Sequence, residues 1–242
     1  MSLGPPVVVS LLLAVLPAPP LAAQVCAGFP PLSESHFRAV VSAVSYSYAT
    51  SLGASFVGGR QLFGILGAAR TRDAELDAST LELSLDGGAD IAFGPARRVF
   101  LCPSLGVSVG LGPYDLLLRD DDYQTVAGAL GLGVAAVVVR SPGLAVVVTG
   151  SLYVVRLTAT RTATGFETIR WSSKDNYGLL SISAGFSCNN LLTIRPGVTI
   201  PFGLLPPGNP DDFAVPFGRE ERELSVGVSV AVGIGRRRRA AP

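Results

Sequence analysis

Charged side chains are scarce in this 242-residue sequence. Asp, Glu, Lys and Arg make up 15% of the chain, whereas hydrophobic residues make up 48% and the mean hydropathy is +0.46. A soluble domain usually carries more charge, at about 25% of its residues, so the composition points to contact with lipid, a very large core, or both. The formal net charge of +1 provides no broad field that would attract nucleic acid or a cationic partner.

Long apolar runs are also lacking after the first 23 residues. No later segment has the ~20 consecutive apolar residues that a membrane helix needs, so a membrane-bound form of this chain would cross with strands. Residues 1–23 contain a shorter apolar run, Val7–Leu16, and end in Leu21-Ala22-Ala23. This arrangement predicts a cleaved signal peptide, which leaves Gln24 as the first residue of the mature chain.

The sequence has a single histidine, His36, which precedes the first expected strand. A general base must lie within hydrogen-bond reach of the proton that it removes, and no nucleophile accompanies His36 in a recognisable pattern. Cys and His do not cluster at metal-ligand spacing, and no glycine-rich loop joins a strand to a helix as a phosphate-binding loop does. We therefore expect no catalytic residues, no cofactor and no dedicated metal centre.

What the sequence does contain is alternation with a period of two. In the last such segment, large apolar residues from Leu224 to Ile234 alternate with Ser, Ala and Gly, and the pattern recurs along the chain. This period indicates strands with two unlike faces. The expected strands are residues 39–47, 52–58, 61–71, 80–93, 98–111, 124–139, 143–158, 175–187, 191–203 and 222–235.

The connections between these runs alternate in length. Short connections rich in turn-forming residues lie at 58–60, 94–97, 140–142 and 188–190, and longer polar ones lie at 72–79, 112–123, 159–174 and 204–221. Short turns at one rim and long loops at the other are typical of bacterial outer-membrane barrels, which have an even number of strands. We expect ten strands, or eight if the first two runs lie outside the wall.

The face opposite the large apolar side chains distinguishes two kinds of barrel. A soluble barrel needs a water-facing side rich in Lys, Glu, Arg and Thr, but here Gly, Ala and Ser dominate that face. Small residues fit the crowded interior of a narrow barrel whose Val, Leu and Ile face lipid. We therefore expect an all-β, antiparallel, up-and-down transmembrane barrel. The alternative is a secreted, soluble, lipocalin-like ligand-binding barrel.

Together, the leader, the strands and the unequal connections resemble the small, porin-like outer-membrane β-barrel proteins of Gram-negative bacteria. The resemblance covers residues 38–235, between a periplasmic N-terminal segment (24–37) and a basic C-terminal tail (236–242). It implies contact with outer-membrane lipid, insertion by the barrel-assembly machinery, and a structural, adhesive or surface-binding role without catalysis. A narrow porin or solute channel is the alternative role. The chain departs from the family in ending on Arg236–Pro242 rather than on an aromatic residue.

Four charged residues are expected to face the lumen. Glu82, Asp86 and Asp90 share the inward face of one strand, and Arg195 lies on the inward face of another. Charges removed from bulk water require a partner or local water. We expect either that Arg195 bridges part of this acidic ladder and narrows the lumen, or that the lumen is hydrated and holds no specific pairing.

The three cysteines, Cys26, Cys102 and Cys188, are all expected near the rim with the short turns, where an oxidising compartment would allow one disulfide. Cys102 with Cys188 is the first expectation, and Cys26 with either of them is the second. The long loops carry carboxylates that either bind divalent cations or are simply hydrated. They are Asp73, Glu75, Asp77, Asp120, Asp121, Asp122, Asp211 and Asp212.

Overall fold

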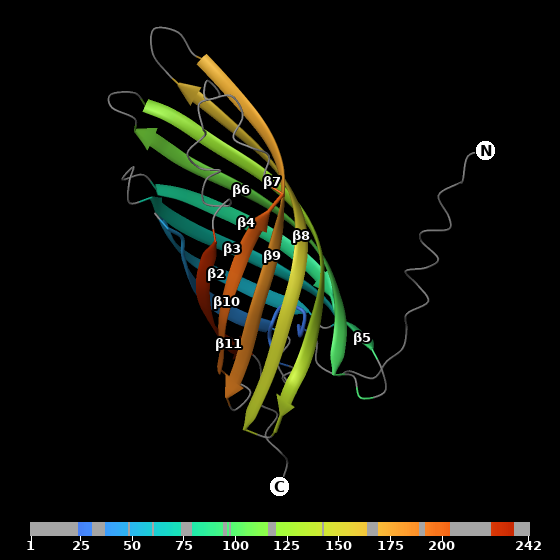
Figure 1. Cartoon of the computed structure of the whole chain (residues 1–242). Coiled ribbons are helices and arrows are strands. Elements are labelled where there is room, and N and C mark those ends of the chain that lie inside the picture. The colour runs from blue at the N-terminus through green and yellow to red at the C-terminus, as the bar shows by residue number, and fades with distance from the viewer. Residues whose placement is uncertain are drawn as a thin grey trace, which may run out of the picture.

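Antiparallel strands curl into a closed barrel in the computed structural model (Figure 1). The structure describes residues 24–30, 37–47, 49–59, 61–73, 79–93, 96, 98–115, 120–141, 143–163, 169–188, 192–203 and 224–234. Its strands are β1 (Phe37–Ser45), β2 (Ala49–Gly59), β3 (Leu62–Asp73), β4 (Ser79–Ala89), β5 (Ile91–Phe93), β6 (Val99–Asp115), β7 (Asp120–Arg140), β8 (Leu144–Ala163), β9 (Ile169–Cys188), β10 (Leu192–Phe202) and β11 (Ser225–Ile234).

The wall of the barrel has ten strand positions, because β4 and β5 occupy one of them. Both pair with β6, and the residue between them is Asp90. The ring closes where β1 pairs with β11, with Phe37 opposite Ile234. The expectation of a ten-stranded, all-β, antiparallel barrel is thus confirmed, and the first two expected strands belong to the wall.

The two ends of the barrel differ. At one end, here called the turn rim, β1 begins, β11 ends, and short connections join β2 to β3, β7 to β8 and β9 to β10. The opposite end is called the loop rim. Strands β6–β9 contain 17, 21, 20 and 20 residues, whereas β1–β4 contain 9 to 12. One side of the wall therefore extends farther at the loop rim (Figure 1).

This extension corrects two of the expected loops. Most of 112–123 and 159–174 is strand, and the pairing continues to Asp115 opposite Asp120 and to Ala163 opposite Ile169. The polarity of these segments suggested loops. The backbone ladder does not depend on polarity, however, and the β-branched residues Thr158, Thr160 and Thr162 favour extended structure.

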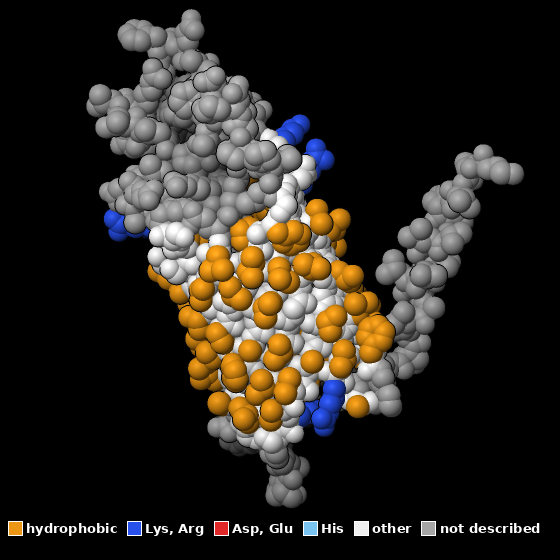
Figure 2. All heavy atoms as spheres, in the orientation of Figure 1, with side chains coloured by type: hydrophobic (Ala, Val, Ile, Leu, Met, Phe, Trp, Pro, Cys, Tyr) orange, Lys and Arg blue, Asp and Glu red, His pale blue; other side chains and the backbone are white. Residues whose placement is uncertain are grey.

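The outer face of the wall is apolar on every strand. Leu62 is 76% exposed and Leu130 is 70% exposed, and large exposed hydrophobic side chains cover the middle of the molecule in Figure 2. The inward positions between them are mostly small residues, as the alternation predicts. Within the described residues, no helix has the length and apolar character required to cross a bilayer.

Candidate functional site in the barrel lumen

Residues Gln24–Pro30, here called the lumen segment, lie inside the barrel near the turn rim (Figure 1, dark blue). Gln24, Val25, Ala27, Gly28, Phe29 and Pro30 are all buried. We expected residues 24–37 to form a periplasmic N-terminal segment. The first seven of them lie in the barrel interior, which makes the lumen the candidate functional site.

A compact turn gives the lumen segment its shape. The carbonyl oxygen of Gln24 accepts hydrogen bonds from the N–H groups of Ala27 and Phe29, both at 3.1 Å, and Gly28 donates to Val25 at 2.8 Å. Gly28 has a φ of +78°, and a Cβ at this position would lie 2.7 Å from Cδ of Arg195. Only glycine fits here without strain or collision.

Asp90 holds the start of the lumen segment. Its Oδ2 accepts hydrogen bonds from the backbone N–H groups of Gln24 at 2.5 Å and Val25 at 2.8 Å, and its Oδ1 accepts one from Cys26 at 2.9 Å. The side chain is 7% exposed. Three convergent N–H donors replace much of the water that a buried carboxylate loses.

A disulfide joins the lumen segment to the wall. It links Cys26 to Cys102 of β6, with a Cα–Cα distance of 5.3 Å, so the first expectation, Cys102 with Cys188, is wrong. Cys102 points inward and is 4% exposed, whereas Cys188 is exposed with a free thiol at the end of β9. Because their side chains lie on opposite faces of the wall, these two cysteines cannot meet.

Two arginines flank the ring of Phe29. The guanidinium carbon of Arg38 lies 4.7 Å from the ring centroid and that of Arg195 lies 5.2 Å from it, both within cation–π range. Arg38 also donates to the carbonyl of Pro30 at 2.9 Å, and Arg195 donates to the carbonyl of Ala27. The aromatic ring and the backbone carbonyls together offset part of the cost of burying two cations.

Arg195 and the carboxylates of the acidic ladder make different contacts. Asp90 binds the lumen segment, while Asp86 and Glu82 face cavities farther along the lumen. Arg195 contacts Ala27, Phe29 and the hydroxyl of Ser229 at 3.2 Å. Among the described residues, the structure brings Arg195 to the lumen segment rather than to a carboxylate of the ladder.

Sequence reasoning missed Arg38 as a lumen residue. Its signal was the alternation itself, because Arg38 lies two positions before the inward-facing Val40. The expected strand began at residue 39, one residue too late to include it. Within the described residues, Nε and Nη1 of Arg38 have no hydrogen-bond partner; the side chain is stabilised by the ring of Phe29, the carbonyl of Pro30 and attraction to Asp90.

Apolar packing completes the seal at the turn rim. Val25 packs with residues of β6, β7 and β8, and Phe29 packs with residues of β1, β2, β3 and β11. The first cluster contains Cys102, Ala135, Val137 and Val147, and the second contains Ala27, Val40, Val57, Phe63 and Ala231. The lumen segment thus contacts most of the circumference of the wall and fills the interior at the turn rim.

Beyond the lumen segment, the interior is hollow and lined with hydroxyl groups. A cavity of about 380 Å³ borders Cys26 and Arg195, and a neighbouring cavity of about 390 Å³ shares Asp86 with it. The serine and threonine side chains that line the first cavity are Ser42, Ser104, Thr149, Ser151, Ser181, Ser183, Thr199, Ser225 and Ser229. Such a lining can hold water or a small polar molecule.

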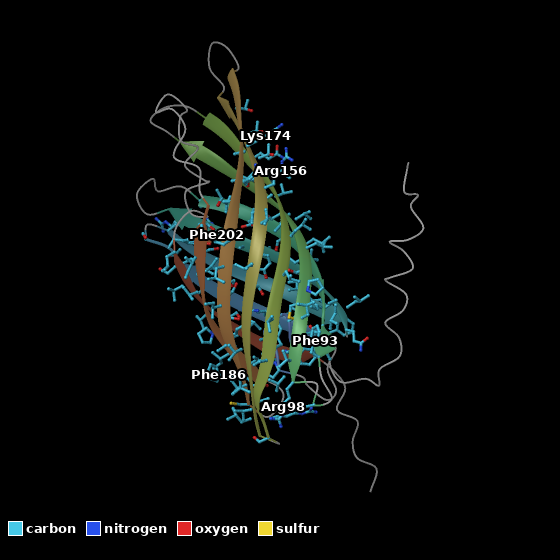
Figure 3. All side chains as sticks on the ribbon, turned by 45° about the vertical axis from the view of Figure 1, so that its right-hand side comes forward. Phe93, Arg98, Arg156, Lys174, Phe186 and Phe202 are labelled. Carbon is cyan, nitrogen blue, oxygen red and sulfur yellow. A yellow bond between two sulfur atoms is a disulfide. The ribbon has the colours of Figure 1, made fainter. Side chains whose placement is uncertain are left out.

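The outer face carries an apolar belt of defined height. On β8 the outward residues are apolar or glycine from Leu144 to Val154, and Arg156 follows as the next outward residue. About ten residue steps at ~3.3 Å and a tilt of ~40° correspond to a belt ~25 Å tall. In Figure 3, Arg98 lies near one end of the barrel, and Arg156 and Lys174 lie toward the other.

Several other predicted residues fall outside what the structure describes. They are His36, Glu75, Asp77, Asp211, Asp212 and the tail 236–242. Asp73 and Asp120–Asp122 lie on β3 and β7, close to the loop rim. Within the described part of the chain, no group of His, Cys, Asp or Glu could hold a metal ion. No protein-family model matches the sequence, and no curated protein matches it.

Proposed function

We propose that this protein is exported and inserted into an outer membrane, where it serves as a closed β-barrel with a structural, adhesive or surface-binding role. The observation that carries this proposal is the apolar belt, ~25 Å tall, which matches the apolar band of outer-membrane barrels. Charged side chains at Arg98 and Arg140 near one edge, and at Arg156 and Lys174 near the other, are exposed where headgroups would lie.

The belt also favours a membrane over water as the surroundings of this barrel. A soluble lipocalin-like barrel directs its large apolar side chains inward, and contiguous apolar patches of more than a few hundred Å² are rare on soluble monomers. Here such side chains point outward on every strand. The inward face, with its hydroxyls and charges, would suit neither a dry core nor an apolar ligand.

The lumen segment argues against a constitutively open channel. It fills the interior at the turn rim and is fixed by a disulfide, by Asp90 and by two arginines. The long polar ends of β6–β9 form a raised edge at the loop rim, which is suited to contact with other molecules. We therefore propose that the protein acts through contacts made at its exposed surface, and not by transporting solutes through the lumen.

A charge placed in the belt tests this proposal. Val148→Arg, near the middle of the belt on β8, should reduce assembly into the outer membrane, because an arginine near the bilayer midplane costs about 2–4 kcal/mol. Ser141→Arg at the turn rim is the matched control and should assemble normally. Assembly is read in isolated outer membranes as a heat-modifiable band on gels. If both variants and the unaltered protein were recovered in the soluble fraction, the membrane proposal would be wrong and the soluble, lipocalin-like barrel would be favoured.

A further inference from the structure

We propose that Asp90 is the binding site for the α-ammonium group of the mature chain, created when the leader is cut between Ala23 and Gln24. The inference rests on the export described above, since only an exported chain meets a signal peptidase. In the cleavage, one water hydrolyses the Ala23–Gln24 peptide bond. The leader keeps the new carboxylate, and the nitrogen of Gln24 becomes an amine that is protonated at neutral pH.

The contacts of Asp90 single out the nitrogen of Gln24. Of the three backbone nitrogens that donate to this carboxylate, that of Gln24 is the closest, at 2.5 Å from Oδ2. Both Gln24 and Asp90 are buried. A buried carboxylate gains more from a full positive charge than from a neutral amide, and charge-assisted hydrogen bonds are the stronger kind.

The nearest alternative cation is already engaged. Arg38 contacts the ring of Phe29 and the carbonyl of Pro30, and among the described residues it forms no ion pair with Asp90. Arg195 is bound to Ala27 and Ser229. Arg38 attracts Asp90 electrostatically without pairing with it directly, whereas an ammonium group on Gln24 would place a positive charge in direct contact with this carboxylate.

The backbone at Gln24 provides an independent argument. Its φ is +88°, the only positive φ of a non-glycine residue in the described part of the chain. In an intact chain this conformation is unfavourable, because the side chain is crowded against the preceding peptide unit. Cleavage before Gln24 removes that peptide unit. The conformation seen here is thus better suited to a first residue than to an internal one.

The sequence offers an unusually direct test, because Lys174 is its only lysine. The mature protein should contain two primary amines, that of exposed Lys174 and the α-amine of Gln24. Full-length chain is expressed in a Gram-negative host, and the folded barrel is extracted in detergent and treated with an amine-acylating reagent. Peptide mass spectrometry then follows each amine, with the rate in unfolded protein as the reference.

We expect the N-terminal peptide to begin at Gln24. Relative to unfolded protein, its α-amine should react slower by roughly tenfold or more, as protected groups do, while Lys174 reacts at nearly its unfolded rate. Asp90→Asn should remove most of that protection. Asp86→Asn is the matched control, since Asp86 of β4 also faces the lumen but lines the cavity instead of contacting the lumen segment.

Three results would overturn the inference: a mature chain that begins at another residue, a Gln24 α-amine that is equally reactive in folded and unfolded protein, or a cyclised N-terminus that has lost ammonia. If Asp90→Asn does not fold, slow acylation of the Gln24 α-amine in the unaltered folded protein still supports the inference. The heat-modifiable band reports membrane insertion separately, so failure of the membrane proposal and failure of this one can be told apart.

Discussion

The carbonyl oxygen of Gly28 lies against Gly185 of β9 so closely that a Cβ on Gly185 would be 2.1 Å from it. Gly185→Ala should therefore push the lumen segment away from the wall, and overpacking of this kind costs about 1–3 kcal/mol. Gly150→Ala is the control, because a Cβ there meets nothing within 4 Å. The measurement is the urea midpoint of the heat-modifiable band. Equal midpoints would show that the lumen segment is not packed as described.

Removal of the disulfide should weaken the barrel more than removal of the remaining thiol. Cys26 and Cys102 are separated by 76 residues, and cross-linking a loop of that length stabilises by about 4 kcal/mol in the chain-entropy model. Cys26→Ser should lower the unfolding midpoint under oxidising conditions, and Cys188→Ser should not. With reductant present, the unaltered protein should approach the Cys26→Ser midpoint, and a reductant-insensitive midpoint would count against the bond.

Truncation of Phe29 should loosen the same region. Phe29→Ala removes apolar packing against Val40, Val57 and Phe63 and leaves two arginines without their ring contact, so a loss of about 3–5 kcal/mol is expected. Phe56→Ala on the outer face should cost less, because that ring is 44% exposed. Urea titrations of the two variants provide the comparison, and the reverse order would contradict the packing described.

Deletion of residues 24–30 should open the lumen. In planar bilayers the complete mature chain should give little or no conductance, because the lumen segment fills the turn rim. The deletion should give discrete channels, and Lys174→Gln in the complete chain serves as a control that leaves the interior intact. Channels of equal size with and without residues 24–30 would mean that the segment does not block the barrel.

Much of the wall could be predicted from the sequence, because alternation is a local property of the chain. The alternation in Leu224–Ile234 can be recognised without information from any other segment. Counting alternate positions in the same way predicts that Asp90 and Arg195 point inward. The ends of β6–β9 were harder to predict. Beyond the belt both faces become polar, so the pattern that marked these strands fades while the hydrogen-bonded ladder continues.

The interior could not be predicted in the same way. The position of Gln24–Pro30 depends on contacts with residues 60 or more positions away, such as Asp90 and Cys102, and short segments carry no periodicity that reveals their surroundings. The first expected cysteine pair was wrong for a different reason, while the second expectation, Cys26 with either of the others, includes the pair that forms. Parity alone does show that Cys102 points inward and Cys188 outward, and that observation would have excluded the first pair.

The position of the lumen segment has a consequence for the order of folding. The segment contacts strands from both ends of the chain, including β1 and β11, which meet at the seam of the barrel. A narrow barrel that had already closed would leave no path for the disulfide-linked turn to enter from the side. We therefore expect the sheet to curl around these residues, so that Gln24–Pro30 acts as a nucleus on which the last strand pairing is completed.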